Sequence, residues 1–382
     1  MAVCVSLTFC FVVYSMLLVT VPVYGLALGA SPLMLGVILS SQYLLPFLLA
    51  IPMGGVVARR GGRFTLVSGA LLMTAGLLLM QALPGYYGLI GGQLLIGLAH
   101  LQMVLSAQTV ISSLAVGPKL EGYFGWYNTW LSGGQVAGPL LAGYWIQSAG
   151  GVGNLFLVMA GIALASGLAG LALTGDAASG ISVTRKQAGF RAQASLMRHN
   201  KGVQVSLAIT VAGMFALGIY SSYLPVYLDS LAMGAMTIGV LVSLRSIVSM
   251  TIRPFIPWVI SVAGGRDKAT LLALCMLFLG LSGLGFTSST YVIALLSVLI
   301  GLGGGLTQPL SMVVLAESVQ REQRSGALGM RLMVNRAVHF LAPLAFGAIL
   351  GASGFGWSFG LSGIFVALVA GVLIWIQRRC GD

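Results

Sequence analysis

The sequence predicts an all-α integral membrane protein with twelve transmembrane helices, arranged as two pseudo-symmetric six-helix halves. Of its 382 residues, 58% are hydrophobic and only 7% are charged, whereas a soluble domain carries roughly 25% charged residues. Long apolar runs alternate with short polar loops along the whole chain, and parts of the first half recur in the second. Since a water-soluble fold could not bury so much apolar surface, the solvent of most of the chain is lipid.

Twelve apolar runs are long enough to cross a bilayer, which takes about 20 residues. In chain order, the predicted spans are 3–26, 34–58, 64–83, 86–115, 124–148, 152–174, 203–228, 235–262, 269–287, 289–316, 328–350 and 355–377.

The basic residues of the loops fix the predicted orientation. Lys and Arg follow every even-numbered span, whereas the loops on the other side hold neither residue. Cytoplasmic loops are the ones enriched in Lys and Arg, so both termini and the 175–202 connection are expected in the cytoplasm. The net charge of +12 therefore reflects membrane topology rather than nucleic-acid binding. We expect a monomer in the cell membrane, which is the inner membrane in a Gram-negative bacterium.

Internal repeats divide the chain into two halves. The segment LLIGLA at 94–99 matches VLIGLG at 298–303, and GPLLAG at 138–143 matches APLAFG at 342–347, both at an offset of 204 residues. The predicted organisation is an N-terminal half over 1–174, a cytoplasmic linker over 175–202 and a C-terminal half over 203–382. Parallel halves of this kind imply a pseudo-two-fold axis along the membrane normal, with a substrate site between them near the midplane.

Several classes of site are not expected. The four cysteines form no CxxC or Cys/His cluster, so neither a metal site nor a disulfide framework is predicted. The run GLGGGLTQP at 301–309 lacks the spacing of a nucleotide-binding loop, and no phosphate-binding GxxxxGK[ST] segment occurs. We therefore expect no cofactor, no direct use of ATP and no enzyme activity.

Three loop and helix motifs carry a resemblance to a known family. The turn after the second span resembles GxLaDRxGRk in Gly55, Ala58, Arg60, Gly62 and Arg63, although Arg59 replaces its acidic residue. The fourth span resembles RxxqGxG only at Gly97, because Gln93 replaces its arginine. The fifth span is the closest match, with Gly125, Gly134, Gly138, Pro139 and Gly143 in a pattern that ends GPxxGG.

On these motifs the chain resembles the major facilitator superfamily over essentially its whole length. The resemblance implies that family's fold and conformational roles for Gly55, Arg60, Gly62, Arg63, Gly134, Gly138, Pro139 and Gly143. The missing acid at Arg59 puts the family's cytoplasmic latch in question, and Arg60 and Arg63 are expected to cap helix carbonyls or pair with Glu121 or Glu317. The fifth-span pattern is associated with drug and metabolite antiporters, with ordinary small-residue helix packing as the alternative.

Polar residues within the spans are the candidates for substrate binding. In the family that the chain resembles, the third, sixth, ninth and twelfth spans stay outside the cavity, and here these spans hold no ionisable residue in their interiors. The candidates all lie in the other spans: Tyr14, Gln93, His100, Gln135, Tyr220, Arg245, Gln308, Asn335, Arg336 and His339. Either His100 or His339 could carry a proton, or each could simply be hydrogen-bonded.

Among these candidates, two arginines give the most specific indication of what is bound. Arg245 and Arg336 lie deep in their spans, while all seven acidic residues lie outside the predicted membrane interior. Since a charge at this depth is costly, we expect these guanidinium groups to meet an anionic group in a water-filled cavity, with carbonyl and Gln partners as the alternative. Arg253 and Arg331 lie closer to the cytoplasmic ends and are expected to snorkel to the interface.

These observations predict a secondary active transporter that moves a small organic compound, anionic or amphipathic, across the cytoplasmic membrane by alternating access. The fifth-span motif favours export by an antiporter, with protons or a counter-transported ion as partners. Uptake of an organic anion by symport or exchange remains an alternative. A non-transporting sensor or membrane assembly factor is the alternative of another class, although the linker is too short for a sensor's soluble domain.

Overall fold

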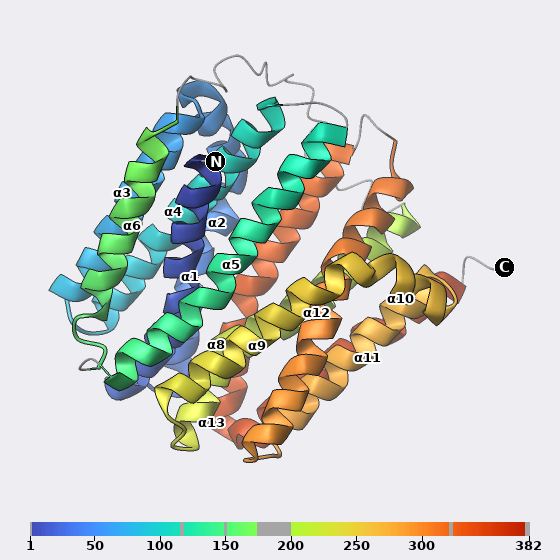
Figure 1. The fold of residues 1–382 in the computed structure, drawn as a ribbon. Helices are drawn as coiled ribbons and strands as arrows, with labels where there is room; N and C mark the ends of the chain where they lie inside the picture. Colours follow the sequence, from blue (N-terminus) through green and yellow to red (C-terminus); the bar gives the residue numbers. More distant parts are fainter. Residues whose placement is uncertain (1, 115–117, 149–150, 174–199, 321–323, 379–382) are drawn as a thin grey trace. The chain divides into compact units, whose positions relative to one another are not determined.

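The computed structural model describes residues 2–114, 118–148, 151–173, 200–320 and 324–378, and the elements found there are all helices (Figure 1). The first group comprises α1 (Ala2–Ala27), α2 (Pro32–Arg60), α3 (Gly62–Ala82), α4 (Tyr86–Leu114), α5 (Pro118–Ser148) and α6 (Leu155–Leu171). The second comprises α8 (Lys201–Ser230), α9 (Ala235–Ile252), the 3-10 turn η1 (Arg253–Phe255), α10 (Ile256–Ala263), α11 (Arg266–Leu284), α12 (Thr290–Ser318) and α13 (Arg324–Arg378). The 175–202 linker lies almost wholly outside the described residues.

The predicted membrane class is confirmed by the length and composition of these helices. Within the described residues, nine helical segments are long and apolar enough to cross a bilayer. One of the nine, in α13, extends over 50 residues and covers both of the last two predicted spans. The remaining predicted spans correspond to α5 and to α6, which is apolar but has only 17 residues.

The structure departs from separate straight helices at two places in the second half of the chain. The span over 235–262 is divided at Pro254 into α9, the 3-10 turn η1 and α10. Proline lacks an N–H and its ring clashes with the preceding turn, so a straight α-helix cannot continue through it. The last two spans are two helices that meet at Gly354, where φ is +71°. Glycine tolerates this left-handed backbone, which other residues rarely adopt.

The chain forms two compact units. Unit 1 comprises α1 to α6 together with Leu228–Ser243, and unit 2 comprises α8 up to Tyr227 and the chain from Leu244 onward. In unit 1, α1 packs against α5 and α6, α2 packs against α4, and α3 packs between α4 and α6 (Figure 1). In unit 2, α11 packs against both α12 and α13. The exact limits of the predicted halves stay a prediction.

The glycine-rich run of α12 lets three helices approach its backbone. A Cβ added to Gly303 would lie 2.7 Å from the carbonyl oxygen of Ala273 in α11. One added to Gly304 would lie 2.7 Å from Leu217 of α8, and one added to Gly305 would meet α9. The run at 301–309 is therefore a close-packing surface at the centre of unit 2.

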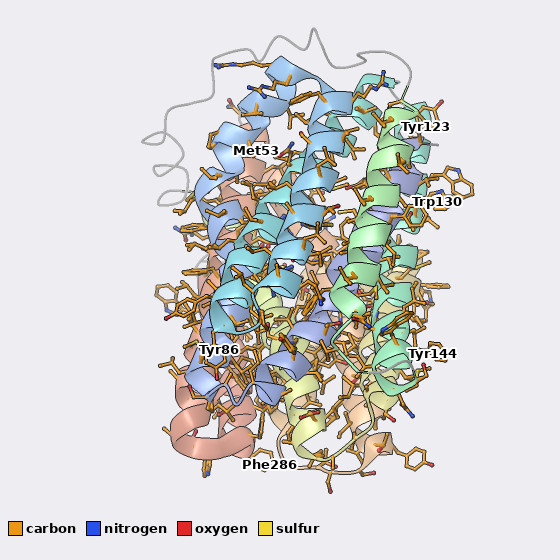
Figure 2. The ribbon with its side chains drawn as sticks, turned by 90° about the vertical axis from the view of Figure 1, so that its left-hand side faces the viewer. Met53, Tyr86, Tyr123, Trp130, Tyr144 and Phe286 are labelled. Atoms are coloured by element: carbon orange, nitrogen blue, oxygen red, sulfur yellow. The ribbon has the colours of Figure 1, made fainter. Side chains whose placement is uncertain are left out.

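Aromatic side chains mark the two ends of α5. Figure 2 shows Tyr123 near one end of this helix and Tyr144 near the other, at the same end of unit 1 as Tyr86. Tyr123 and Tyr144 are exposed, and the 21 residue steps from one to the other correspond to about 31 Å of helix. That length matches a hydrocarbon core of about 30 Å flanked by interfacial Tyr and Trp.

The acidic side chains that the structure describes lie at helix ends. Asp229 is exposed at the end of α8, Asp267 is in the first turn of α11, and Glu317 is exposed in the last turn of α12. Within the described residues the one ion pair joins Glu317 to Arg266. Glu317 is thus engaged inside unit 2, and the Glu121 side chain lies outside the described side chains.

Candidate functional site

The ten predicted substrate-binding residues are divided between the two units. Unit 1 holds Tyr14, Gln93, His100 and Gln135, and unit 2 holds Tyr220, Arg245, Gln308, Asn335, Arg336 and His339. Each unit is described separately below.

In unit 2, four of these residues form what we call the cationic cluster: Tyr220, Arg245, Arg336 and His339. The guanidinium carbon of Arg245 lies 5.7 Å from the centroid of the Tyr220 ring, in a cation–π contact. Arg336 and His339 lie three residues apart on α13, a spacing that places them on neighbouring positions of one helix face. Helices α8, α9 and α13 therefore supply the two positive charges and the imidazole of the cluster.

The helices around the cationic cluster hold its members in place. Tyr220 is fully buried, at 0% exposure. Nη2 of Arg245 donates to the Ser246 hydroxyl at 3.0 Å. Gly218 leaves room for His339, since a Cβ there would lie 3.2 Å from Nδ1 of the imidazole. The ring of His339 therefore packs against α8 at a position that has no side chain.

Arg331 has a different environment from the one expected at the membrane interface. Its side chain is 3% exposed, and both Nε and Nη2 donate to the Ser311 hydroxyl, at 3.0 and 2.7 Å. Nη2 also donates to the backbone carbonyl of Gln308 at 3.2 Å. The snorkelling prediction was wrong for Arg331, because a hydroxyl and a carbonyl of α12 satisfy this guanidinium inside unit 2.

Asn335 and Gln308 meet at a residue that the sequence did not single out. Nδ2 of Asn335 lies 3.1 Å from the sulfur of Met214, and Nε2 of Gln308 lies 3.9 Å from the same sulfur. Met214 belongs to α8 and is 1% exposed. In a sequence, a methionine within an apolar span is indistinguishable from an ordinary core residue, so no signal marked it.

In unit 1, Tyr14 and His100 form a stacked pair. Their ring centroids are 4.0 Å apart with an interplanar angle of 23°, and Phe11 meets the His100 ring edge-on at 4.9 Å. His100 is buried and Tyr14 is half-buried. Helices α1 and α4 thus bring together, in one aromatic stack, two residues that the sequence predicted separately.

Two glutamines of unit 1 are buried near this pair. Gly97 of α4 approaches the backbone of Gln42 in α2, and Gln93 lies one turn before Gly97. Among the described residues, neither Nε2 of Gln42 nor Oε1 of Gln93 has a hydrogen-bond partner. Buried polar atoms of this kind are normally satisfied by water or a ligand. The fourth predicted residue of unit 1, Gln135, is half-buried on α5.

The same kind of glycine contact occurs once within each unit. Gly97 of α4 touches the backbone of Gln42 in α2, and Gly301 of α12 touches the backbone of Arg245 in α9. The two glycines are 204 residues apart, which equals the offset of the internal repeats, and their two partners are 203 apart, one residue fewer. The position of Arg245 in unit 2 thus corresponds to that of Gln42 in unit 1.

The family is decided by a comparison over nearly the whole chain. The model of the Major Facilitator Superfamily matches residues 3–282 and 265–379. The chain belongs to the major facilitator superfamily. It is therefore a multi-pass membrane transporter rather than an enzyme. No curated protein matches the chain in sequence.

Solved transporters of this superfamily's fold are similar over almost their full length. The nucleoside transporter NupG is 13% identical with a TM-score of 0.78, covering 99% of this chain and 98% of that one. A bacterial homolog of the human lysosomal transporter Spinster, inward-facing and occupied, is 12% identical with a TM-score of 0.77, over 99% and 96%. A POT family transporter in complex with a thioalcohol-conjugated peptide is 14% identical with a TM-score of 0.80, over 100% and 96%. At these identities the likeness shows the fold alone.

The superfamily motif in α5 is a close-packing surface on two sides. A Cβ at Gly134 would lie 2.7 Å from the Thr8 carbonyl oxygen, and one at Gly138 would lie 2.6 Å from that of Val12, both in α1. On another side, Gly143 faces the Ala235 carbonyl in α9, and Pro139 faces Gly239. These contacts lie within unit 1 and explain the small residues, while a role in transport direction stays a prediction.

The basic residues of the superfamily turn between α2 and α3 lie on the surface of unit 1. Arg60 and Arg63 are exposed, and the Arg60 guanidinium lies 5.3 Å from the ring centroid of Phe64, the residue that replaces a basic side chain of the motif. Gly62 packs against Val110 of α4, whereas the space around Gly55 is open. The expected gating role of this turn remains a prediction.

Proposed function

We propose that this superfamily member transports a small organic compound with an acidic group by secondary, alternating-access transport. The cationic cluster of unit 2 supports the proposal, because Arg245 of α9 lies over the buried Tyr220 ring of α8, and Arg336 lies three residues from His339 in α13. Like charges so placed repel one another strongly at low dielectric, and a bound anion relieves that repulsion. A planar guanidinium also matches a carboxylate or phosphate in a bidentate fashion.

Export across the cytoplasmic membrane is the direction that we favour, because α5 carries the motif associated with antiporters. Uptake of an organic anion by symport or exchange is the second candidate, and the cationic cluster favours it. In either direction His100 or His339 is the proposed carrier of a coupled proton. Cytoplasmic termini and a monomeric state belong to the same proposal.

The test replaces each clustered arginine by lysine, which keeps the charge and loses the planar fork. Arg245→Lys and Arg336→Lys should each lower transport of acidic compounds by roughly tenfold or more, equivalent to about 1.4 kcal/mol. Initial rates in vesicles, measured in both directions over a panel of acidic, neutral and cationic compounds, check this. Protein abundance in the membrane should be unchanged.

Arg253→Lys is the matched control, because Arg253 lies in η1 at the Pro254 break, and its effect should be milder. A neutral or cationic substrate whose transport is unchanged in both cluster variants would refute the acid assignment. The two arginines would then be structural.

A further inference from the structure

Two amide donors from different helices of unit 2 converge on one buried sulfur. Asn335 of α13 and Gln308 of α12 direct their side-chain nitrogens at Sδ of Met214, at 3.1 and 3.9 Å. The sulfur itself is inaccessible, since Met214 is 1% exposed. Both amide side chains are only half-buried and can therefore be reached by a bound molecule.

A thioether is a weak acceptor for amide hydrogens. Donors held only by such an acceptor retain most of their capacity to bind an oxygen, so replacing the sulfur with a carbonyl, hydroxyl or ether oxygen is favourable. The contact with Met214 thus orients the amides without satisfying them fully.

The same helices fix the position of these donors. The backbone carbonyl of Gln308 accepts from Nη2 of Arg331 at 3.2 Å and from the Ser311 hydroxyl at 2.8 Å. Asn335 directly precedes Arg336 and lies four residues from His339 on α13. Consecutive helix residues point about 100° apart, and four residues correspond to about 6 Å, so the amides lie about one helical turn from the His339 end of the cationic cluster.

We propose that Asn335 and Gln308 form a second subsite, which binds an uncharged oxygen of the transported acid, and that Met214 holds both amides when the subsite is empty. This inference rests on the proposed transport of an acid, and it defines more narrowly which acids are substrates. The substrate carries an acidic group and a neutral acceptor oxygen about 6 Å apart. Met214 is then a specificity-determining residue that touches the amides rather than the acid.

The first experiment compares three acids that differ in one oxygen: hexanoate, 2-oxohexanoate and 5-oxohexanoate. Thermal unfolding of the full-length protein in detergent is followed at increasing concentrations of each acid. We expect 5-oxohexanoate to bind about tenfold more tightly than hexanoate, the gain of roughly one hydrogen bond. The 2-oxo acid should resemble hexanoate, because its second oxygen lies too close to the carboxylate. Asn335→Leu and Gln308→Leu should abolish the advantage of the 5-oxo acid.

The second experiment follows the methionine directly in the wild-type chain and so does not depend on a variant that folds. The methyl groups of all methionines are labelled with ¹³C, and the Met214 and Met330 signals are assigned from Met214→Leu and Met330→Leu. On addition of 5-oxohexanoate the Met214 signal should shift, as the amides leave the sulfur. Met330 packs in a separate apolar cluster with Val203 and Leu315, and its signal should stay in place.

Equal binding of hexanoate and 5-oxohexanoate, with a stationary Met214 signal, overturns the subsite and leaves the acid assignment standing. Absence of stabilisation by all three acids also overturns the subsite. The Arg245→Lys and Arg336→Lys variants then decide separately whether the proposed function stands.

Discussion

Arg331 and Arg245 show how differently two arginines within membrane-spanning helices are accommodated. Arg331 is buried and directs its N–H groups at a hydroxyl and a carbonyl of α12. Arg245 is half-buried over the Tyr220 ring. A buried guanidinium whose acceptor is removed loses a charge-assisted hydrogen bond without a replacement from water. Arg331 therefore has a structural role that can be measured as stability.

Ser311→Ala should destabilise the protein by about 1–2 kcal/mol, because two donors of Arg331 lose their shared acceptor. The measurement is the free energy of unfolding of the solubilised protein. Ser353→Ala is the matched control, since its hydroxyl bonds only to the Ile349 carbonyl of its own helix. Equal losses in the two variants would show that the Arg331 contacts do not stabilise the protein.

At this scale the sequence shows which polar residues lie within the spans, but it does not show what they touch. Arg331, Asn335 and His339 follow one another at a spacing of four residues, which places them on one side of α13, and all three contact neighbouring helices. Their partners were not readable, because contacts with Ser311, Met214 and Gly218 depend on the rotation and separation of helices that are distant in sequence. For the same reason Tyr14 and His100 did not stand out as a stacked pair.

Glycine contacts set the distances between helices in both units. The most consequential one for the candidate site joins Gly301 of α12 to α9. A Cβ at Gly301 would lie 2.8 Å from the Arg245 carbonyl oxygen, closer than real side chains approach. Any substituent there must displace the backbone that carries the Arg245 guanidinium.

Gly301→Ala should therefore lower transport several-fold and destabilise the protein by about 1–3 kcal/mol, as overpacking does elsewhere. Initial transport rates and unfolding free energies, taken on the same preparations, check both effects. Gly371→Ala in α13 is the control, because the space around that glycine is open. The control should keep its activity and its stability should be unchanged or slightly higher. Full activity in Gly301→Ala would mean that the position of α9 at Arg245 is not critical.

The helices themselves were largely predictable, since long apolar runs in lipid must form hydrogen-bonded helices. The departures lie where backbone chemistry overrides hydropathy. Pro254 divides the eighth span into α9 and α10, and Gly354 joins the last two spans at a positive φ. Hydropathy is insensitive to both effects, because the flanking residues remain apolar.

At the scale of the molecule, the distribution of Lys and Arg makes a prediction about orientation. In a cysteine-free background, single cysteines at Ser148 and Asp229, both exposed at helix ends, should react in whole cells with a membrane-impermeant thiol reagent. A cysteine within 175–202 should react only after the cells are opened, because the five Lys and Arg of this connection favour a cytoplasmic location. Reaction of the 175–202 position in intact cells would reverse the proposed topology.

The family and the twelve-span membrane class could be predicted from the sequence because both rest on features that persist along the chain: hydropathy, loop charge and the 204-residue repeat. The substrate could not be predicted, because it depends on a few side chains whose neighbours come from several helices. The cationic cluster, for instance, combines residues of α8, α9 and α13 that lie more than 100 residues apart at the extremes.

The paired glycine crossings also bear on how the molecule arose. Gly97 with Gln42 and Gly301 with Arg245 are two copies of one helix crossing, as expected when a six-helix segment is duplicated and fused. The same crossing occurs in both halves, with an amide side chain at the contacted position in one half and a guanidinium in the other. A different side chain at this position therefore changes the charge that a half carries, while the helix crossing stays the same.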